Sequence, residues 1–314
     1  MKSPRVLLLF LDGVGVGSDD PSTNPLAAAA APALRQILEG RKVVAESFPF
    51  IGTRASGVAL DATLGVAGLP QSGTGQIALL TGVNAAEQFG RHFGPYAPTS
   101  LRLLVERESV LARAARAGAT VTFANGYPGS LIAMAAGSAR RPLPLRAAIT
   151  IAALGAGVLK RHEADIISGN AIASEITHDF WRAASGRSEI PDIAAVQAGR
   201  NLARIANTHD LTLFAHYGTD SAGHRKEMSA GIAAWQLVDE FMGGVVSDLN
   251  DDVLLIVASD HGNLEDIRMQ HTRNPALCIV VGPGHQTLAG RLRALTDVTP
   301  ELLGLLATRG CRRA

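Results

Sequence analysis

The sequence predicts an α/β fold: a mostly parallel β-sheet with helices on both faces, plus a small inserted lid or cap. Short apolar runs alternate with helical patterns along the chain, which is typical of a parallel sheet covered on both sides. Three of these runs are closely followed by an aspartate, at Asp12, Asp220 and Asp260. Open α/β sheets bind ligands beyond the carboxyl ends of their strands. The sequence therefore also predicts a ligand-binding site at the edge formed by the carboxyl ends of these strands.

Five apolar runs are predicted as strands, at 6–11, 120–124, 211–215, 253–258 and 276–281. The first follows Lys2 and Arg5, as in a signal peptide, but it ends in an aspartate and glycines without a cleavage site. We therefore interpret it as a buried strand.

Helices are predicted between these strands, at 25–38, 76–80 and beyond, 108–117, 193–207, 230–250 and 299–308. In the last, we expect Thr299 as N-cap and Pro300 at the first helical position, where proline loses no hydrogen bond.

The segment 128–188 interrupts the alternation, because it has helical patterns but no clear pair of strands. We expect it to be an inserted, mainly helical lid or cap, with 1–127 and 189–314 forming the core. Its apolar stretch 147–159 is too short for a membrane span, which needs about 20 residues. That stretch is expected to be a buried or lid helix, or to bury a contact in a homo-oligomer.

The composition favours a small-molecule partner. A formal net charge of +1 gives no field that would attract nucleic acid or an anionic membrane, so neither is expected as a partner. Cys278 and Cys311 lie in a predicted buried strand and in the tail. They imply no disulfide framework, and a reducing, cytoplasmic location is expected.

Metal-ligand side chains gather in the second half of the chain. Adjacent Asp260 and His261 at a strand end point in different directions, which favours two neighbouring ions over a mutual pair. Asp220 and His224 are spaced i, i+4 and can face one ion, and His271 adds a further imidazole. The alternatives are capping or turn aspartates beside surface or hydrogen-bonded histidines. Carboxylates and imidazoles suit Zn²⁺ or Mn²⁺, and Mg²⁺ is possible.

Two weaker signals lie in the first half. Asp12 is followed by glycines that let the backbone approach an ion or phosphate closely. Ser72 stands at the entrance of a helical pattern, where a helix N-terminus favours an anion. The surrounding loop lacks the lysine of a nucleotide-binding loop. The alternative is that Ser72 or Thr74 only caps the helix.

In chain order, these residues resemble the alkaline phosphatase superfamily, in particular its metalloenzyme branch with cofactor-independent phosphoglycerate mutase and phosphopentomutase. The family's order of Asp, Ser, Asp-x-x-x-His, Asp-His and His is complete. The resemblance implies two divalent metal ions and Ser72 as a nucleophile that bridges toward both. One ion would be held by Asp220, His224 and His271, and the other by Asp12, Ser72, Asp260 and His261.

Two departures from the mutases bear on the reaction. The chain runs from Thr81 through 90–96 into the 108–117 helix without a large cap, and Gln76 stands where the mutases usually have histidine. We therefore expect a phosphomonoester hydrolase with a phosphoserine intermediate on Ser72. The alternatives are a phosphomutase, a phosphodiesterase or a catalytically dead metal-binding relative. The substrate is expected to be a small phosphoester, with candidate binding residues Arg91, His92, Asn125, Arg225 and Thr74.

Overall fold

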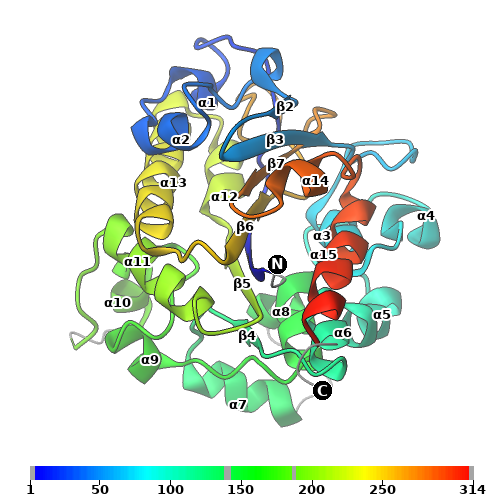
Figure 1. The fold of residues 1–314 in the computed structure, drawn as a ribbon, viewed down its shortest axis with the longest axis vertical. Helices are drawn as coiled ribbons and strands as arrows, with labels where there is room; N and C mark the ends of the chain where they lie inside the picture. The colour runs from blue at the N-terminus through cyan, green and yellow to red at the C-terminus, as the bar shows by residue number, and fades with distance from the viewer. Residues whose placement is uncertain (1–3, 138–142, 186–188, 311–314) are drawn as a thin grey trace.

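The structure is a computed structural model that describes residues 4–137, 143–185 and 189–310. Its centre is a seven-stranded sheet in the order β2-β3-β7-β6-β1-β5-β4 (Figure 1). The strands are β1 (Arg5–Leu11), β2 (Phe50–Ile51), β3 (Ala55–Leu60), β4 (Val121–Phe123), β5 (Leu211–His216), β6 (Val253–Ala258) and β7 (Ala276–Val281).

Most strands run in one direction, as predicted. β1 pairs in parallel with β5 and β6, and β4 pairs in parallel with β5. β7 is antiparallel to both β6 and β3, so β3 runs in the direction of the parallel strands. β2 is antiparallel to β3 at the edge.

The central strand β1 is buried on both faces. Val6, Leu8 and Phe10 belong to one hydrophobic cluster, whereas Leu7 and Leu9 belong to the other. A run buried on both sides has no polar face, which explains why β1 is continuously apolar.

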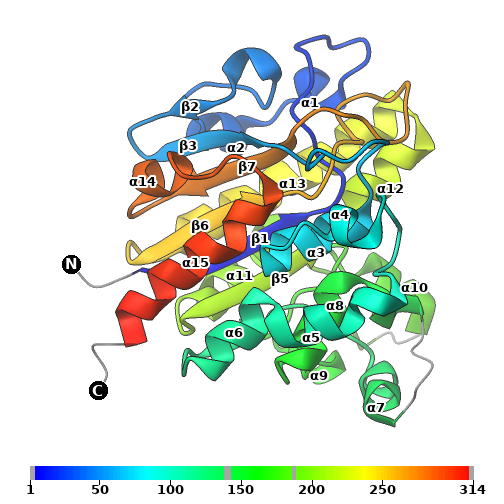
Figure 2. The ribbon, with the colours of Figure 1, turned by 90° about the vertical axis from the view of Figure 1, so that its right-hand side faces the viewer.

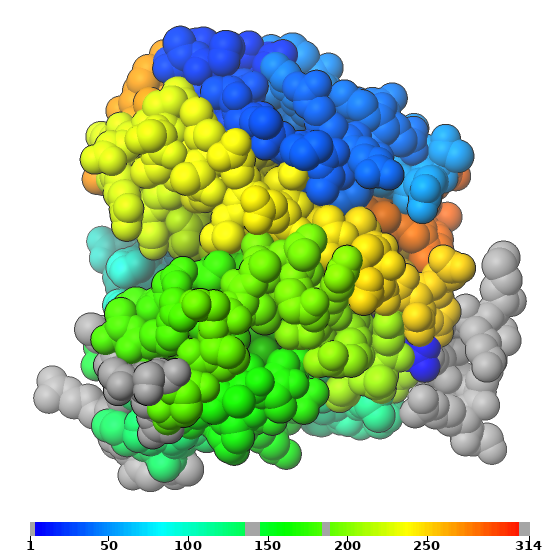
Figure 3. All heavy atoms as spheres, turned by 90° about the vertical axis from the view of Figure 1, so that its left-hand side faces the viewer, coloured from blue at the N-terminus to red at the C-terminus, as the bar shows by residue number. Residues whose placement is uncertain are grey.

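Helices cover both faces. One face carries α3 (Ser72–Thr81), α5 (Arg102–Glu108), α6 (Val110–Arg116), α8 (Ala148–Gly155) and α15 (Leu295–Gly310) (Figure 2). The other carries α1 (Pro25–Ala28), α2 (Pro32–Ile37), α11 (Ala195–Ala206) and α13 (Met228–Asp248). In the space-filling view, yellow α13 lies between the blue N-terminal segments and green α11 (Figure 3). The shorter elements are α4 (Ala85–Phe89), α7 (Gly129–Gly137), α9 (Glu163–Ile167), α10 (Asp179–Ser185), α12 (Gly218–Arg225), α14 (His285–Ala289) and the 3₁₀ turns Ala45–Ser47, Thr99–Leu101 and Leu143–Arg146.

Three sequence predictions are corrected by the structure. The 25–38 helix is two helices, because Pro32 disfavours the helical conformation at Ala31, which is non-helical with φ −133° and ψ 70°. The 108–117 helix is divided at Ser109, whose side chain caps α6. The predicted cap of the last helix is wrong: α15 begins at Leu295 and contains Pro300. The hydroxyl of Thr299 instead donates to the carbonyl of Leu79, at 2.8 Å.

Part of the 128–188 segment packs within the core. Ile149 and Ile151 of α8 are fully buried in the cluster that also contains α3. The segment also covers the β4 edge, where Ile172 donates its N–H to the carbonyl of Ala124, at 2.9 Å. The division into a core and a lid stays a prediction. Among the described residues, no helix has both the length and the apolar character of a membrane span.

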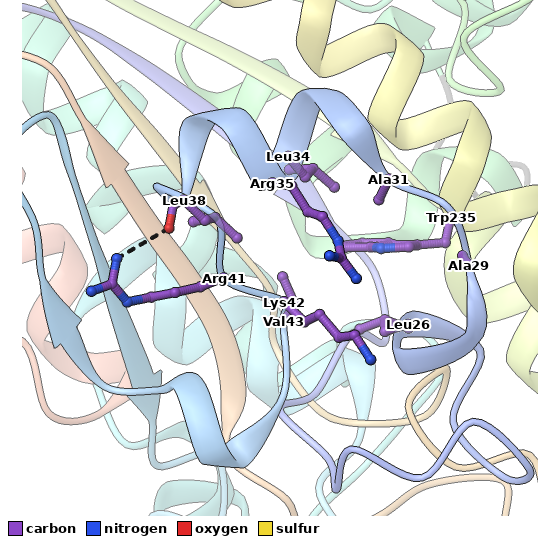
Figure 4. Close-up of a pocket in the computed structure, with 10 residues that line it drawn as sticks. All are labelled: Leu26, Ala29, Ala31, Leu34, Arg35, Leu38, Arg41, Lys42, Val43 and Trp235. Atoms are coloured by element: carbon purple, nitrogen blue, oxygen red, sulfur yellow. Dashed lines mark hydrogen bonds between the residues drawn. The ribbon is translucent and has the colours of Figure 1, made fainter.

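A small basic hollow lies between α2 and α13 (Figure 4). Its volume of about 10 Å³ holds one water molecule at most. Arg41 donates to the carbonyl of Leu38, at 3.3 Å, and Lys42 pairs with Asp19, at 2.7 Å. These cations therefore belong to the packing of the N-terminal segment, and the hollow is too small for a ligand.

Candidate metal centre

The order of the sheet brings three aspartates together. β6, β1 and β5 are neighbouring parallel strands, so their carboxyl ends share one edge. Asp12 directly follows β1, Asp260 closely follows β6, and Asp220 lies in the first turn of α12, which follows β5.

Two groups of ligand-type side chains form at this edge. Asp220, His224 and His271 make one, and Asp12, Asp220 and His261 make the other, with the potential ligand atoms of each group within 4.8 Å of one another. The first group is the set that the family resemblance implied. The second shares Asp220, and Asp260 lies beside it, with its Oδ1 3.8 Å from Nε2 of His261. The two groups also differ in exposure: the His224 side chain is 39% exposed, whereas that of His261 is fully buried.

The chemistry of this pocket fits divalent cations. Oδ1 of Asp12 and Oδ2 of Asp260 are buried and have no hydrogen-bond partner in the described structure. Burying a carboxylate without a partner is costly, and a cation removes that cost. The donor set of carboxylates and imidazoles is one that Zn²⁺, Mn²⁺ and related ions accept. The residues therefore fit a metal, although their geometry does not select one ion.

The same crowding shifts the pKa values of the cluster. Burial raises the pKa of Asp12, and the nearby charge of Asp220 raises it further. Burial also raises the pKa of Asp260 well above its usual value. Burial alone would lower the pKa of His261, but the carboxylates of Asp260 and Asp12 outweigh it and raise that pKa to about 10. Without cations, protons would thus be retained among these carboxylates.

Ser72 is the first residue of α3, and its side chain faces the buried group. Its Oγ lies 2.9 Å from Nε2 of His261. Gln71, rather than Ser72, is the N-cap of the helix. Gly75, one turn further, makes this close approach possible, because a Cβ there would lie 2.7 Å from the carbonyl oxygen of Asp260.

Sequence reasoning missed two residues that hold the ligands in place. The amide of Asn263 donates to Oδ1 of Asp220, at 2.6 Å. Glu265, only 1% exposed, accepts from the N–H groups of Gly15 and Asn263, each at 2.8 Å. It also accepts from the Thr272 hydroxyl and, at 3.1 Å, from the Asn274 amide. Their position could have identified them, since both closely follow Asp260-His261 in a stretch of buried residues.

The predicted substrate residues fall in different places. Arg91 and His92 line a cavity of about 500 Å³ together with Gln71, the residue before Ser72. Arg225 is exposed at the end of α12, beside His224. Asn125 is buried, and its amide both donates to and accepts from the backbone of Ala215.

Thr74, the remaining predicted residue, faces the protein interior, as does Gln76, which stands where the mutases usually have histidine. The hydroxyl of Thr74 accepts from the N–H of Phe93, at 3.2 Å. Gln76 is 1% exposed and directs its amide toward Asp12, at 3.5 Å. The assignment of Thr74, Arg91, His92, Asn125 and Arg225 to a substrate stays a prediction.

Comparisons with known proteins identify the family of the chain. A family model described as the Metalloenzyme superfamily matches residues 4–309. A 2,3-bisphosphoglycerate-independent phosphoglycerate mutase from Syntrophotalea carbinolica is 35% identical over 114 residues, which are 33% of this chain and 22% of that protein. A protein of the same name from Cereibacter sphaeroides is 30% identical over 161 residues, which are 46% of this chain and 31% of that protein. The chain thus matches less than a third of the length of either relative.

Solved structures share the fold at low sequence identity. The PH0037 protein from Pyrococcus horikoshii has a TM-score of 0.58 at 12% identity, and the alkaline phosphatase from the Antarctic bacterium TAB5 has 0.54 at 15%. Each alignment covers 98% of both chains. The family predicted from the order of the motifs is thereby confirmed. The chain belongs to the Metalloenzyme superfamily and has an alkaline phosphatase-like fold.

Proposed function

We propose that the protein transfers a phosphoryl group through Ser72, with two divalent cations at the adjoining ligand groups. The observation that carries the proposal is the position of the Ser72 hydroxyl, 2.9 Å from His261 and at the first turn of α3. When bound, such cations lower the pKa of a coordinated hydroxyl and neutralise charge on the phosphoryl oxygens.

The chain's own residues would orient the reactants. The first N–H groups of a helix lack intrahelical acceptors. At the start of α3 the N–H of Thr74 donates to the carbonyl of Phe93, so those of Ser72 and Gly73 would be the donors to a phosphoryl group beside Ser72. Asn263 holds the carboxylate of Asp220, the residue common to both ligand groups, in a fixed orientation. Glu265 joins the loops that follow Asp12, His261 and His271. The nucleophile would therefore meet a preorganised set of charges.

The acceptor of the phosphoryl group distinguishes two candidates. The names of the curated relatives support a phosphomutase, in which a second substrate hydroxyl takes the group from Ser72. They do not favour the hydrolase expected from the sequence, so we place the mutase first. The exposed side chain of His224 supports the hydrolase as second candidate, because water that reaches the site can attack a phosphoserine.

The test compares the wild-type protein with the Ser72→Ala variant after loading with Mn²⁺, Zn²⁺ or Mg²⁺. Phosphomonoesters, a phosphodiester, 3-phosphoglycerate and ribose 1-phosphate serve as substrates, and ³¹P NMR follows both isomers and free phosphate. Isomerisation that depends on Ser72 supports the mutase, and phosphate release that depends on Ser72 supports the hydrolase. Metal binding without turnover of any phosphoester would refute the proposal and indicate a catalytically dead relative.

A further inference from the structure

We propose that Gln76 is a positioning residue of the metal centre. Its amide holds one oxygen of the Asp12 carboxylate and leaves the other oxygen free for a cation. The inference deepens the proposed function and rests on its metal centre, because it adds a residue that belongs to neither ligand group. Gln76 should therefore contribute to metal affinity, and not to the stability of the metal-free protein.

Gln76 lies on the face of α3 that carries Ser72. It follows Ser72 by four residues, and side chains at that spacing lie one above the other on a helix. Oγ of Ser72 lies 2.9 Å from Nε2 of His261, and Nε2 of Gln76 lies 3.5 Å from Oδ2 of Asp12. Oδ1 of Asp12 lies 3.4 Å from the same nitrogen of His261. Two successive turns of the helix therefore contact the buried ligand group.

The backbone of Gln76 is fixed by close packing on either side of it. At the preceding residue, Gly75, a Cβ would lie 2.7 Å from the carbonyl oxygen of Asp260. One turn further along, the carbonyl of Leu79 accepts from the Thr299 hydroxyl, at 2.8 Å. Because α3 is held at both points, the Gln76 side chain starts from a fixed position relative to the ligand group.

The two oxygens of the Asp12 carboxylate differ in their surroundings. The backbone of Asp12 is held on both sides, since its N–H donates to the carbonyl of His216, at 3.0 Å, and its carbonyl accepts from the Thr219 hydroxyl, at 2.5 Å. In the side chain, Oδ2 accepts from the Gln76 amide, whereas Oδ1 is buried without a hydrogen-bond partner. A donor on Oδ2 opposes rotation of the carboxylate, as hydrogen bonds to metal-binding carboxylates generally do. Oδ1 then remains available to a cation.

The Gln76 side chain is unfavourable in the metal-free interior. It is 1% exposed, and its Oε1 is buried without a hydrogen-bond partner. Burying such a carbonyl costs free energy that an apolar side chain of similar size would not cost. The hydrogen bond to Asp12 is long, at 3.5 Å, and therefore offsets little of this cost. Packing alone does not explain a glutamine here, whereas a role in the metal-bound protein does.

The neutral amide also suits the charge of the site. Within the described residues, no lysine or arginine forms a salt bridge with Asp12, whose recorded ion-pair contact is with His261. A cationic donor in the place of Gln76 would compete with a metal ion for the Asp12 charge. The amide can orient the carboxylate without neutralising it.

The test measures metal binding and stability separately, without turnover. Gln76→Met removes the amide and keeps an unbranched side chain of similar length. The wild-type and variant proteins are freed of metal with a chelator, titrated calorimetrically with Mn²⁺, and unfolded with urea in the absence and presence of Mn²⁺. The control is Asn201→Leu in α11, which removes another buried amide, one that accepts from Gln197 at 3.1 Å on the other face of the sheet.

We expect Gln76→Met to weaken Mn²⁺ binding at one site about 10- to 100-fold, while the metal-free protein is as stable as the wild type or more so. Asn201→Leu should leave the Mn²⁺ affinity unchanged. Unchanged affinity in Gln76→Met, or a loss of metal-free stability that would indicate a packing role, would overturn the inference. A wild-type protein that binds no Mn²⁺ would overturn it as well. Absence of phosphoryl transfer would bear only on the proposed function, because both measurements are independent of turnover.

Discussion

Glu265→Gln tests whether one buried carboxylate holds the metal centre together. In the wild-type protein, Oε2 accepts two backbone N–H groups, and Oε1 accepts the Thr272 hydroxyl and the Asn274 amide. If the glutamine NH₂ group takes the place of Oε2, it faces two backbone N–H donors; if it takes the place of Oε1, it faces the Asn274 amide, whereas the Thr272 hydroxyl can turn to accept from it. One or two hydrogen bonds to a charged acceptor are therefore lost, at about 1.5–3 kcal/mol each. We expect a loss of about 1.5–6 kcal/mol in the free energy of unfolding.

The substitution should also weaken metal binding, because the donors belong to the loops that carry Asp12, His261 and His271. Losses of about 10- to 100-fold are typical when a group that orients metal ligands is removed. Urea unfolding and calorimetric metal titration measure the two effects. The matched control is Asp266→Asn, whose carboxylate pairs with the exposed Arg268 and should contribute less than about 1 kcal/mol. A Glu265→Gln protein with the stability and metal affinity of this control would refute the reasoning.

Three further predictions follow from single contacts. Gly75→Ala should lower the melting temperature and the metal affinity, because the added Cβ would lie 2.7 Å from the backbone carbonyl oxygen of Asp260. The control is Gly304→Ala in α15, where nothing lies within 4 Å of an added Cβ, and it should stabilise the protein by about 0.5–1 kcal/mol. Burial raises the pKa of Cys278 to about 12, so in a Cys311→Ser background, thiol reagents at pH 8 should react only after unfolding; rapid labelling of the native protein would contradict this. Native mass spectrometry should find one metal ion fewer in the His224→Ala protein than in the wild-type protein, since His224 belongs to only one of the two ligand groups. Loss of both ions, or of neither, would contradict the assignment of one ion to each group.

The strand ends that carry Asp12 and Asp260 are easier to predict from the sequence than the periphery of the fold, for a physical reason. Asp12 and Asp260 follow strongly apolar runs, so both the strands and their ends are visible. β3 is composed largely of small residues and is defined by its pairing with β7. Its strand conformation thus depends on a partner more than 200 residues away.

Glu265 could not be assigned from the sequence for the same reason. Its role depends on Gly15, which lies 250 residues away in the chain, and no local pattern contains that contact. The start of α15 shows the opposite error. Thr299 and Pro300 form a plausible local cap, but the Thr299 hydroxyl hydrogen-bonds to α3 within a longer helix.

The burial of α8 limits how the 128–188 segment could move. A segment that swung as one rigid body would draw Ile149 and Ile151 out of the core, at about 1.5–3 kcal/mol for each side chain. Movements confined to α9 and α10, outside this anchor, avoid that barrier. Any movement of the segment would then be a local rearrangement around a fixed helix.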